Sequence, residues 1–112
     1  MNPKGYVVVL EGDPLIRSLL GRWLVEAGYI VSAGTEKEEP VLVIADLPDP
    51  QSAESPIQSL REYAAPILLL SARFRHGLAG SEETAFRLGV KRVLPKPFTR
   101  EELLAAVRES VE

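Results

Sequence analysis

The sequence has no cysteine among its 112 residues, so neither a disulfide framework nor a thiolate zinc site is available to the fold. It also lacks any apolar run near the roughly 18 residues that a membrane-spanning helix needs. The amino-terminal stretch MNPKGYVVVLEGDP lacks the long apolar region of a signal peptide. Together these absences predict a soluble protein in a reducing, cytoplasmic compartment.

Clustered positive charge is missing as well. The 13 lysines and arginines are scattered along the chain, and with 16 acidic residues they leave a formal net charge of −3. The electrostatic footprint of a nucleic-acid binder is therefore absent, and we expect no nucleic-acid partner. The single histidine, His76, lies in the polar stretch RFRHGLAGS, and we interpret it as solvated rather than catalytic or metal-binding.

Short apolar runs alternate with helical patterns along the chain. Because a chain of this length with 46% hydrophobic residues can bury one core, we expect residues 1–112 to form a single domain. Helical spacing predicts a helix over 14–27, with Asp13 as N-cap and Gly28 as its stop. Five runs without helical period are bounded by turn residues, which predicts strands over 6–10, 29–33, 41–45, 67–70 and 91–94.

A second helix is predicted at the end of the chain, over 99–111. There Thr99 and Glu102 have the spacing of a capping box, and the apolar residues that follow share one face. Weaker helical patterns cover 53–63 and 81–88. Strands that alternate with helices in this way predict an α/β fold with a doubly wound parallel sheet.

Ligands of such sheets bind at the carboxyl ends of the strands, where the strand order reverses. Four of the predicted strands place chemically useful side chains at that edge. They are Glu11 and Asp13 after the first strand, Asp46 after the third, Ser71 after the fourth and Lys96 after the fifth. The edge therefore gathers three carboxylates, a hydroxyl and an ammonium group.

Neighbouring carboxylates repel one another, and a divalent hard cation such as Mg²⁺ relieves that repulsion. This predicts a magnesium-assisted phosphoryl site with Asp46 as the nucleophile and Glu11, Asp13 and Asp46 as metal ligands. Lys96 and Ser71 would contact the phosphoryl oxygens. Taken singly, most of these residues also have a purely structural explanation, since Asp46 can form a turn, Asp13 can cap a helix and Ser71 can end a strand.

Four stretches carry a resemblance to a known family: VVVLEGDPLIRSLLGRWLVEAGYIV, VLVIADLPDP, PILLLSA and GVKRVLPKPFTREELLAAVRESV. Over nearly its whole length the chain resembles the receiver domain of two-component response regulators. The resemblance implies a flavodoxin-like, five-stranded parallel sheet of order 2-1-3-4-5. It also implies that Asp46 is the phosphoacceptor, Ser71 the hydroxyl switch residue and Lys96 the lysine usual in the family, followed by Pro97, a position that is often cis.

The sequence departs from the family pattern at three places. Gly12 takes the position of the second acidic residue that follows the first strand, and Val93 that of the aromatic partner of the hydroxyl switch. Only TEKEEP joins the second and third predicted strands, so a short loop replaces the helix that the family has there. We expect this loss to leave an apolar sheet face uncovered over the first three strands, available to a homodimer or another protein.

Two functions remain open on this evidence. The first is a non-enzymatic receiver-like signalling domain in which a sensor histidine kinase phosphorylates Asp46 with the help of Mg²⁺. The alternative is a phosphorylation-independent pseudo-receiver that acts as a protein-protein interaction module. The chain has neither G-x-x-x-x-G-K-[ST] nor, after its first strand, G-x-G-x-x-G, which argues against a nucleotide enzyme, and a small hydrolase using Asp46 rests on little beyond the shared carboxylates.

Overall fold

The computed structural model describes residues 5–32, 39–46, 62, 65–71 and 89–111. Within these residues the chain forms five strands and two helices. In chain order they are β1 (Tyr6–Leu10), α1 (Pro14–Glu26), β2 (Ile30–Ser32), β3 (Leu42–Asp46), β4 (Ile67–Ser71), β5 (Arg92–Pro95) and α4 (Arg100–Val111).

Several expectations fall on other parts of the chain. The weaker helix predictions over 53–63 and 81–88 lie outside the described residues, apart from Glu62, and so does His76. The predicted loop between the second and third strands is described only at Glu39 and Pro40, which have no regular secondary structure. Neither α1 nor α4 has the length and apolar character that a bilayer crossing requires.

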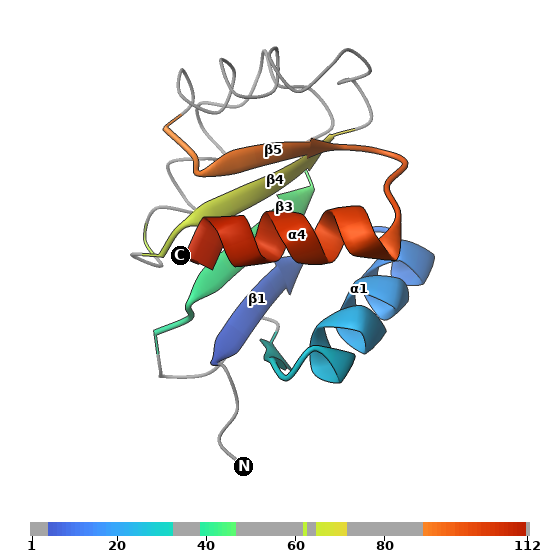
Figure 1. Ribbon diagram of the computed structural model, residues 1–112, viewed down its shortest axis with the longest axis horizontal. Helices are drawn as coiled ribbons and strands as arrows, with labels where there is room; N and C mark the ends of the chain where they lie inside the picture. Colours follow the sequence, from blue (N-terminus) through green and yellow to red (C-terminus); the bar gives the residue numbers. More distant parts are fainter. Residues whose placement is uncertain (1–4, 33–38, 47–61, 63–64, 72–88, 112) are drawn as a thin grey trace.

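The five strands form one parallel sheet in the order β2-β1-β3-β4-β5, which confirms the predicted fold class and strand order (Figure 1). The predicted strand bounds were correct to within one residue. Tyr29 falls just before β2 because its backbone N–H donates to the carbonyl of Leu24 and completes the end of α1 (3.0 Å). Asp46 belongs to β3 because it still pairs with Leu70.

Local signals set both ends of α1 and the start of α4, as the sequence predicts. At the start of α1, Oδ1 of Asp13 accepts hydrogen bonds from the backbone N–H groups of Leu15 (2.9 Å) and Ile16 (3.4 Å). Gly28 follows α1 with a φ of 101°, a conformation that favours glycine. At the start of α4, the backbone N–H of Thr99 donates to Glu102 and that of Glu102 donates to the Thr99 hydroxyl (2.9 and 3.1 Å).

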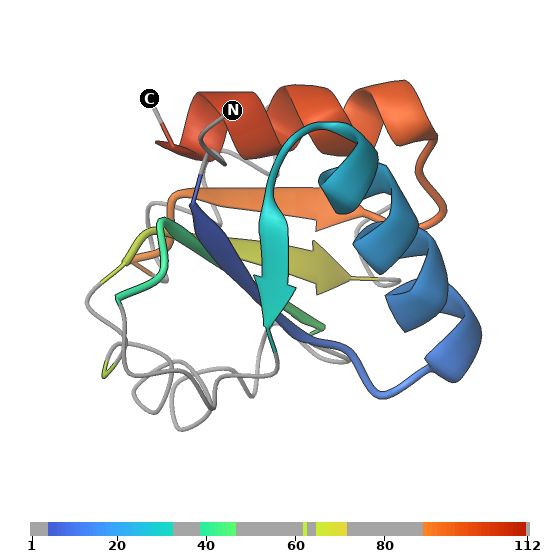
Figure 2. The ribbon, with the colours of Figure 1, turned by 90° about the horizontal axis from the view of Figure 1, so that it is seen from below.

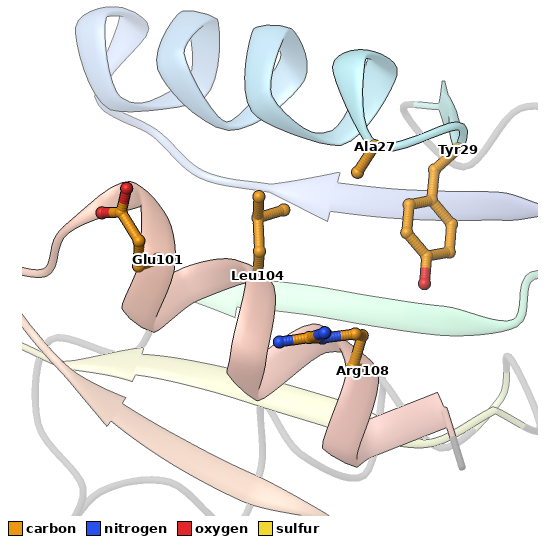
Figure 3. Close-up of a pocket in the computed structure, with 5 residues that line it drawn as sticks. All are labelled: Ala27, Tyr29, Glu101, Leu104 and Arg108. Atoms are coloured by element: carbon orange, nitrogen blue, oxygen red, sulfur yellow. The ribbon is translucent and has the colours of Figure 1, made fainter.

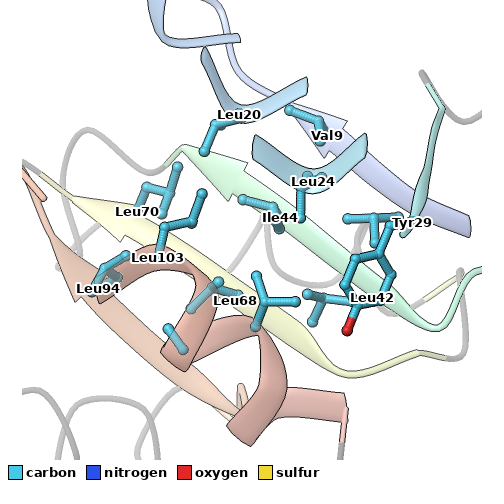
Figure 4. Packing of buried hydrophobic residues seen from close by; sticks show 13 residues of the cluster. Val9, Leu20, Leu24, Tyr29, Leu42, Ile44, Leu68, Leu70, Leu94 and Leu103 are labelled. Atoms are coloured by element: carbon cyan, nitrogen blue, oxygen red, sulfur yellow. The ribbon is translucent and has the colours of Figure 1, made fainter. Parts of the chain in front are cut away.

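Both described helices pack on the same face of the sheet (Figures 1 and 2). Figure 4 shows the resulting core, in which leucines of α1 and α4 meet alternate residues of β1, β3, β4 and β5. Its largest fully buried members include Leu20, Leu24, Leu42, Ile44, Leu68, Leu70 and Leu103. Because successive strand residues point to opposite faces, this core fixes which strand residues remain for the second face.

The second face corrects the prediction of an uncovered surface over the first three strands. On β1 and β3 the side chains of Val8, Val43 and Ala45 are 3%, 0% and 5% exposed in the single chain, so they are not available to a partner. They pack with residues of β4 and β5 in a second apolar cluster. The proposed basis for a homodimer is therefore lost over β1 and β3. On the edge strand β2, Ile30, which pairs with Tyr6 of β1, keeps 38% exposure.

Candidate functional site

The carboxyl ends of β1, β3 and β5 meet through one ammonium group. The backbone N–H of Lys96 donates to the carbonyl of Ser71 (2.9 Å), which continues the β4–β5 ladder and fixes the start of the lysine side chain. That side chain then extends past β4, which lies between β3 and β5. Its Nζ lies 2.6 Å from Oδ1 of Asp46 and 2.9 Å from Oε2 of Glu11, so the predicted convergence of these residues is confirmed.

The three charged groups differ in how open they are to solvent. The Glu11 side chain is only 2% exposed, that of Lys96 15% and that of Asp46 25%. Both oxygens of Glu11 accept hydrogen bonds, Oε2 from Lys96 and Oε1 from the backbone N–H of Asp13 (3.1 Å). Asp46 is therefore the carboxylate best placed to meet an incoming molecule, while Glu11 holds the lysine from the buried side.

Sequence reasoning missed the direct pairing of Lys96 with Glu11, and it missed Arg17. Nη1 of Arg17 donates to the backbone carbonyl of Glu11 (3.4 Å), which ties the first turn of α1 to the end of β1. The available signal for the pairing of Lys96 with Glu11 was Gly12, which stands where the family pattern has an acidic residue. With fewer carboxylates at the site, the lysine can neutralise more of their charge. No sequence pattern pointed to Arg17.

Lys96 responds to two opposing influences on its pKa. Burial disfavours the charged ammonium, but hydrogen bonds to Asp46 and Glu11, with the attraction of both carboxylates, outweigh burial and raise the pKa of Lys96 above its ordinary value. The folded chain thus holds this proton more tightly than the unfolded chain does. The resulting stabilisation is fully present below the ordinary lysine pKa of about 10.4 and is lost as the pH rises through the folded-state value.

This difference predicts an alkaline loss of stability that depends on Lys96. We expect the free energy of unfolding of the wild type to fall more steeply between about pH 9 and about pH 12 than that of Lys96→Met, which has no ammonium to titrate. Urea denaturation followed at several pH values measures both slopes. Parallel slopes in the two proteins would contradict a raised pKa of Lys96.

The structure places the other predicted residues at the same edge of the sheet. Asp13 is exposed and its Oδ1 caps α1, whereas Ser71 is fully buried at the end of β4. Gly12 is exposed, with no atom within 4 Å of the position that a Cβ would take. Among the residues that the structure describes, no three histidine, cysteine, aspartate or glutamate side chains form a group that could hold a metal ion. Asp13 is thus not brought together with Glu11 and Asp46 as the predicted ligand set requires.

The Lys96–Pro97 peptide bond is cis, as the family resemblance implies. Val93, at the position of the family's aromatic, is buried in the second apolar cluster beside Leu69, its partner in the β4–β5 ladder. Its side chain therefore serves the packing of the sheet. The resemblance implied the cis bond, whereas the packing of Val93 is seen only in the structure.

A separate cleft of about 310 Å³ lies between the end of α1 and α4 (Figure 3). Leu104 and Ala27 contribute apolar walls, Tyr29 lies at one end, and Glu101 and Arg108 supply opposite charges from α4. None of the predicted site residues lines this cleft. The chemistry expected from the sequence therefore belongs to the edge that holds Asp46.

Comparison with known sequences gives one relevant relative. No family model matches the chain. Over 91% of its length it is 31% identical to Protein PetR of Rhodobacter capsulatus. The chain spans 46% of that protein, so the likeness concerns less than half of the relative.

Comparison with solved structures gives close matches over the whole chain. The chemotaxis response regulator CheY4 of Vibrio cholerae has 21% identity and a TM-score of 0.74, covering 98% of this chain and 99% of that one. A response regulator receiver protein from Burkholderia phymatum has 24% identity and a TM-score of 0.74, covering 96% and 95%. HP1043, an orphan response regulator of H. pylori, has 15% identity and a TM-score of 0.73, with both chains fully covered. The chain therefore has the fold of the receiver domains of response regulators.

Proposed function

We propose that the chain is a receiver-like signalling domain of a two-component phosphorelay and that Asp46 accepts the phosphoryl group. The observation that carries this proposal is the contact of Asp46 with Lys96, at 2.6 Å, on a carboxylate that stays 25% exposed at the carboxyl edge of the sheet. A sensor histidine kinase in the cytoplasm is the proposed donor. The domain transmits a signal and is not an enzyme in this proposal.

The proposed transfer uses a carboxylate oxygen of Asp46 as the nucleophile. That oxygen attacks phosphorus, and an O–P bond forms while the P–N bond of a phosphohistidine breaks. The other ring nitrogen of the phosphohistidine carries a proton, so the donor leaves as neutral imidazole when the P–N bond breaks, and Asp46 becomes an acyl phosphate. Lys96 stabilises the negative charge on the transferring oxygens, because its ammonium already lies within hydrogen-bonding distance of Asp46.

The product replaces the single negative charge of Asp46 with nearly two, since a phosphoryl group adds strongly acidic oxygens. Lys96 is the group that responds first, because it is shared between Asp46 and Glu11. A stronger attraction toward the phosphorylated Asp46 weakens its contact with Glu11. A partner that reads the edge of the sheet would then meet a different arrangement of charge.

The second candidate function is a pseudo-receiver that binds a partner without phosphorylation. Gly12 and the capping role of Asp13 favour it, because both reduce the number of carboxylates directed into the site. Val93 favours it too, since a buried valine offers no aromatic side chain to change rotamer with the state of Asp46. In that case the contacts among Glu11, Asp46 and Lys96 serve stability alone.

Intact mass spectrometry after incubation with phosphoramidate separates the two functions. We expect the wild type to gain the mass of one phosphoryl group, and Asp46→Asn to gain none. Glu39→Gln is the control, since Glu39 is an exposed carboxylate just ahead of β3, at its opposite end, and its loss should leave the adduct unchanged. Equal labelling of wild type and Asp46→Asn would refute the role of Asp46, and the absence of any adduct would favour the pseudo-receiver.

A further inference from the structure

We propose that the ammonium group of Lys96 takes the place of a divalent cation between Glu11 and Asp46, so that the site operates without Mg²⁺. This inference rests on the proposed function for its meaning in signalling. Its physical basis is the arrangement of the ammonium group and the carboxylate oxygens at the carboxyl edge of the sheet, which does not suit a metal ion.

The first observation is the position of the lysine nitrogen. Nζ of Lys96 lies 2.9 Å from Glu11 and 2.6 Å from Asp46, which is the space that a cation shared by the two carboxylates would occupy. A magnesium ion binds oxygen ligands at about 2.0–2.1 Å in a near-octahedral shell. A magnesium ion that bridged the two oxygens that Lys96 contacts would have to displace the ammonium, because the two positive charges would otherwise repel each other at short range.

The second observation is that both oxygens of Glu11 already accept a hydrogen bond. Oε2 accepts a hydrogen bond from Lys96 and Oε1 accepts one from the backbone N–H of Asp13, inside a side chain that is 2% exposed. Glu11 as a metal ligand would have to share its oxygens with these two hydrogen-bond donors. It would also have to admit the metal's remaining water molecules into a buried position.

The third observation concerns the neighbours that could have completed a ligand set. The Oδ1 atom of Asp13 is held by two backbone N–H groups of α1, and Gly12 has no side chain. A carboxylate added at residue 12 would enter open space, since nothing lies within 4 Å of a Cβ built there. The backbone of Gly12 is also outside the left-handed region, so a larger residue fits without strain. A carboxylate can therefore be supplied at residue 12, next to Glu11 in the chain, without a clash.

Isothermal titration with MgCl₂ at constant ionic strength tests the inference on three proteins. We expect no saturable binding by the wild type, and saturable binding by Gly12→Asp with an affinity at least tenfold above the upper limit that the wild-type titration sets. Gly21→Asp is the matched control, because it adds the same charge at another glycine with open space around it, on α1. It should behave as the wild type does.

Saturable binding of Mg²⁺ by the wild type at millimolar concentration would overturn the inference. A failure of Gly12→Asp to gain affinity over Gly21→Asp would overturn the expectation that a carboxylate supplied at residue 12 allows a metal ion to bind. A second readout is the phosphoryl adduct formed with phosphoramidate, which should change less than twofold when Mg²⁺ is replaced by a chelator. The titration with MgCl₂ does not require phosphorylation. A wild type that forms no phosphoryl adduct would refute the proposed function, and the binding of Mg²⁺ would still decide this inference.

Discussion

Replacement of Lys96 by methionine is expected to lower the free energy of unfolding by about 3–5 kcal/mol, the usual effect of removing one partner from a buried ion pair. The methionine fills much of the space of the lysine stem but leaves the carboxylates of Glu11 and Asp46 facing each other without a counter-ion. Because Glu11 is only 2% exposed, water cannot readily take over its solvation. Urea denaturation of the wild type and the variant at neutral pH measures the loss.

Two further variants test whether this loss comes from the charge. Lys91→Met removes an exposed lysine just before β5 and is expected to change stability by no more than about 0.5 kcal/mol. Glu11→Gln added to Lys96→Met removes one of the two negative charges that repel each other, and it should recover part of the lost stability. An effect of Lys96→Met as small as that of Lys91→Met would show that the ammonium does not hold the site together.

Truncation of Leu68 to alanine is expected to cost about 2–5 kcal/mol, the range for removing a large aliphatic side chain from a packed core. Leu68 lies in β4, is fully buried, and packs in the core beneath α4 (Figure 4). Removing it leaves a cavity that neither the sheet nor the helix can easily fill. Thermal or urea denaturation gives the size of the loss.

Leu15→Ala is the matched control for the core variant, because the same atoms are removed from a side chain that is 77% exposed on α1. It is expected to change stability by no more than about 0.5 kcal/mol. A comparable loss in both variants would mean that burial in this core does not decide the cost. A loss confined to Leu68→Ala would support the packing of β4 against the helices.

Signals that act within a few residues were sufficient for much of the fold. The caps at Asp13 and Thr99, and the glycine after α1, set the helix ends because their hydrogen bonds close over only two to four residues. The strands were recognisable because both faces of a parallel sheet are buried, which produces short, continuous apolar runs. The strand order came from the family resemblance and was confirmed.

The details of the site were less accessible, because they depend on side-chain positions between residues far apart in the sequence. The sequence brought Lys96, Glu11 and Asp46 to one edge but could not show that the lysine, 85 residues beyond Glu11, bonds to both carboxylates at once. Asp13 illustrates the same difficulty, since its two possible roles, as the cap of α1 and as a metal ligand, differ only in the direction of its carboxylate. The prediction of an uncovered sheet face was wrong because it inferred exposure from a missing helix, whereas Val8 and Val43 are buried within the chain.

The shortness of the two outer strands bears on how copies of this domain avoid one another at high concentration. An edge strand exposes backbone groups to which a foreign strand can add, and long, flat, apolar edges thereby promote aggregation. Within the residues that the structure describes, β2 has three residues, and β5 has four, beginning with Arg92 and ending with Pro95. The edge at β5 carries a guanidinium and a proline, and the edge at β2 offers only a short row of backbone groups. Neither edge gives a foreign strand much to pair with in extending the sheet into fibrils.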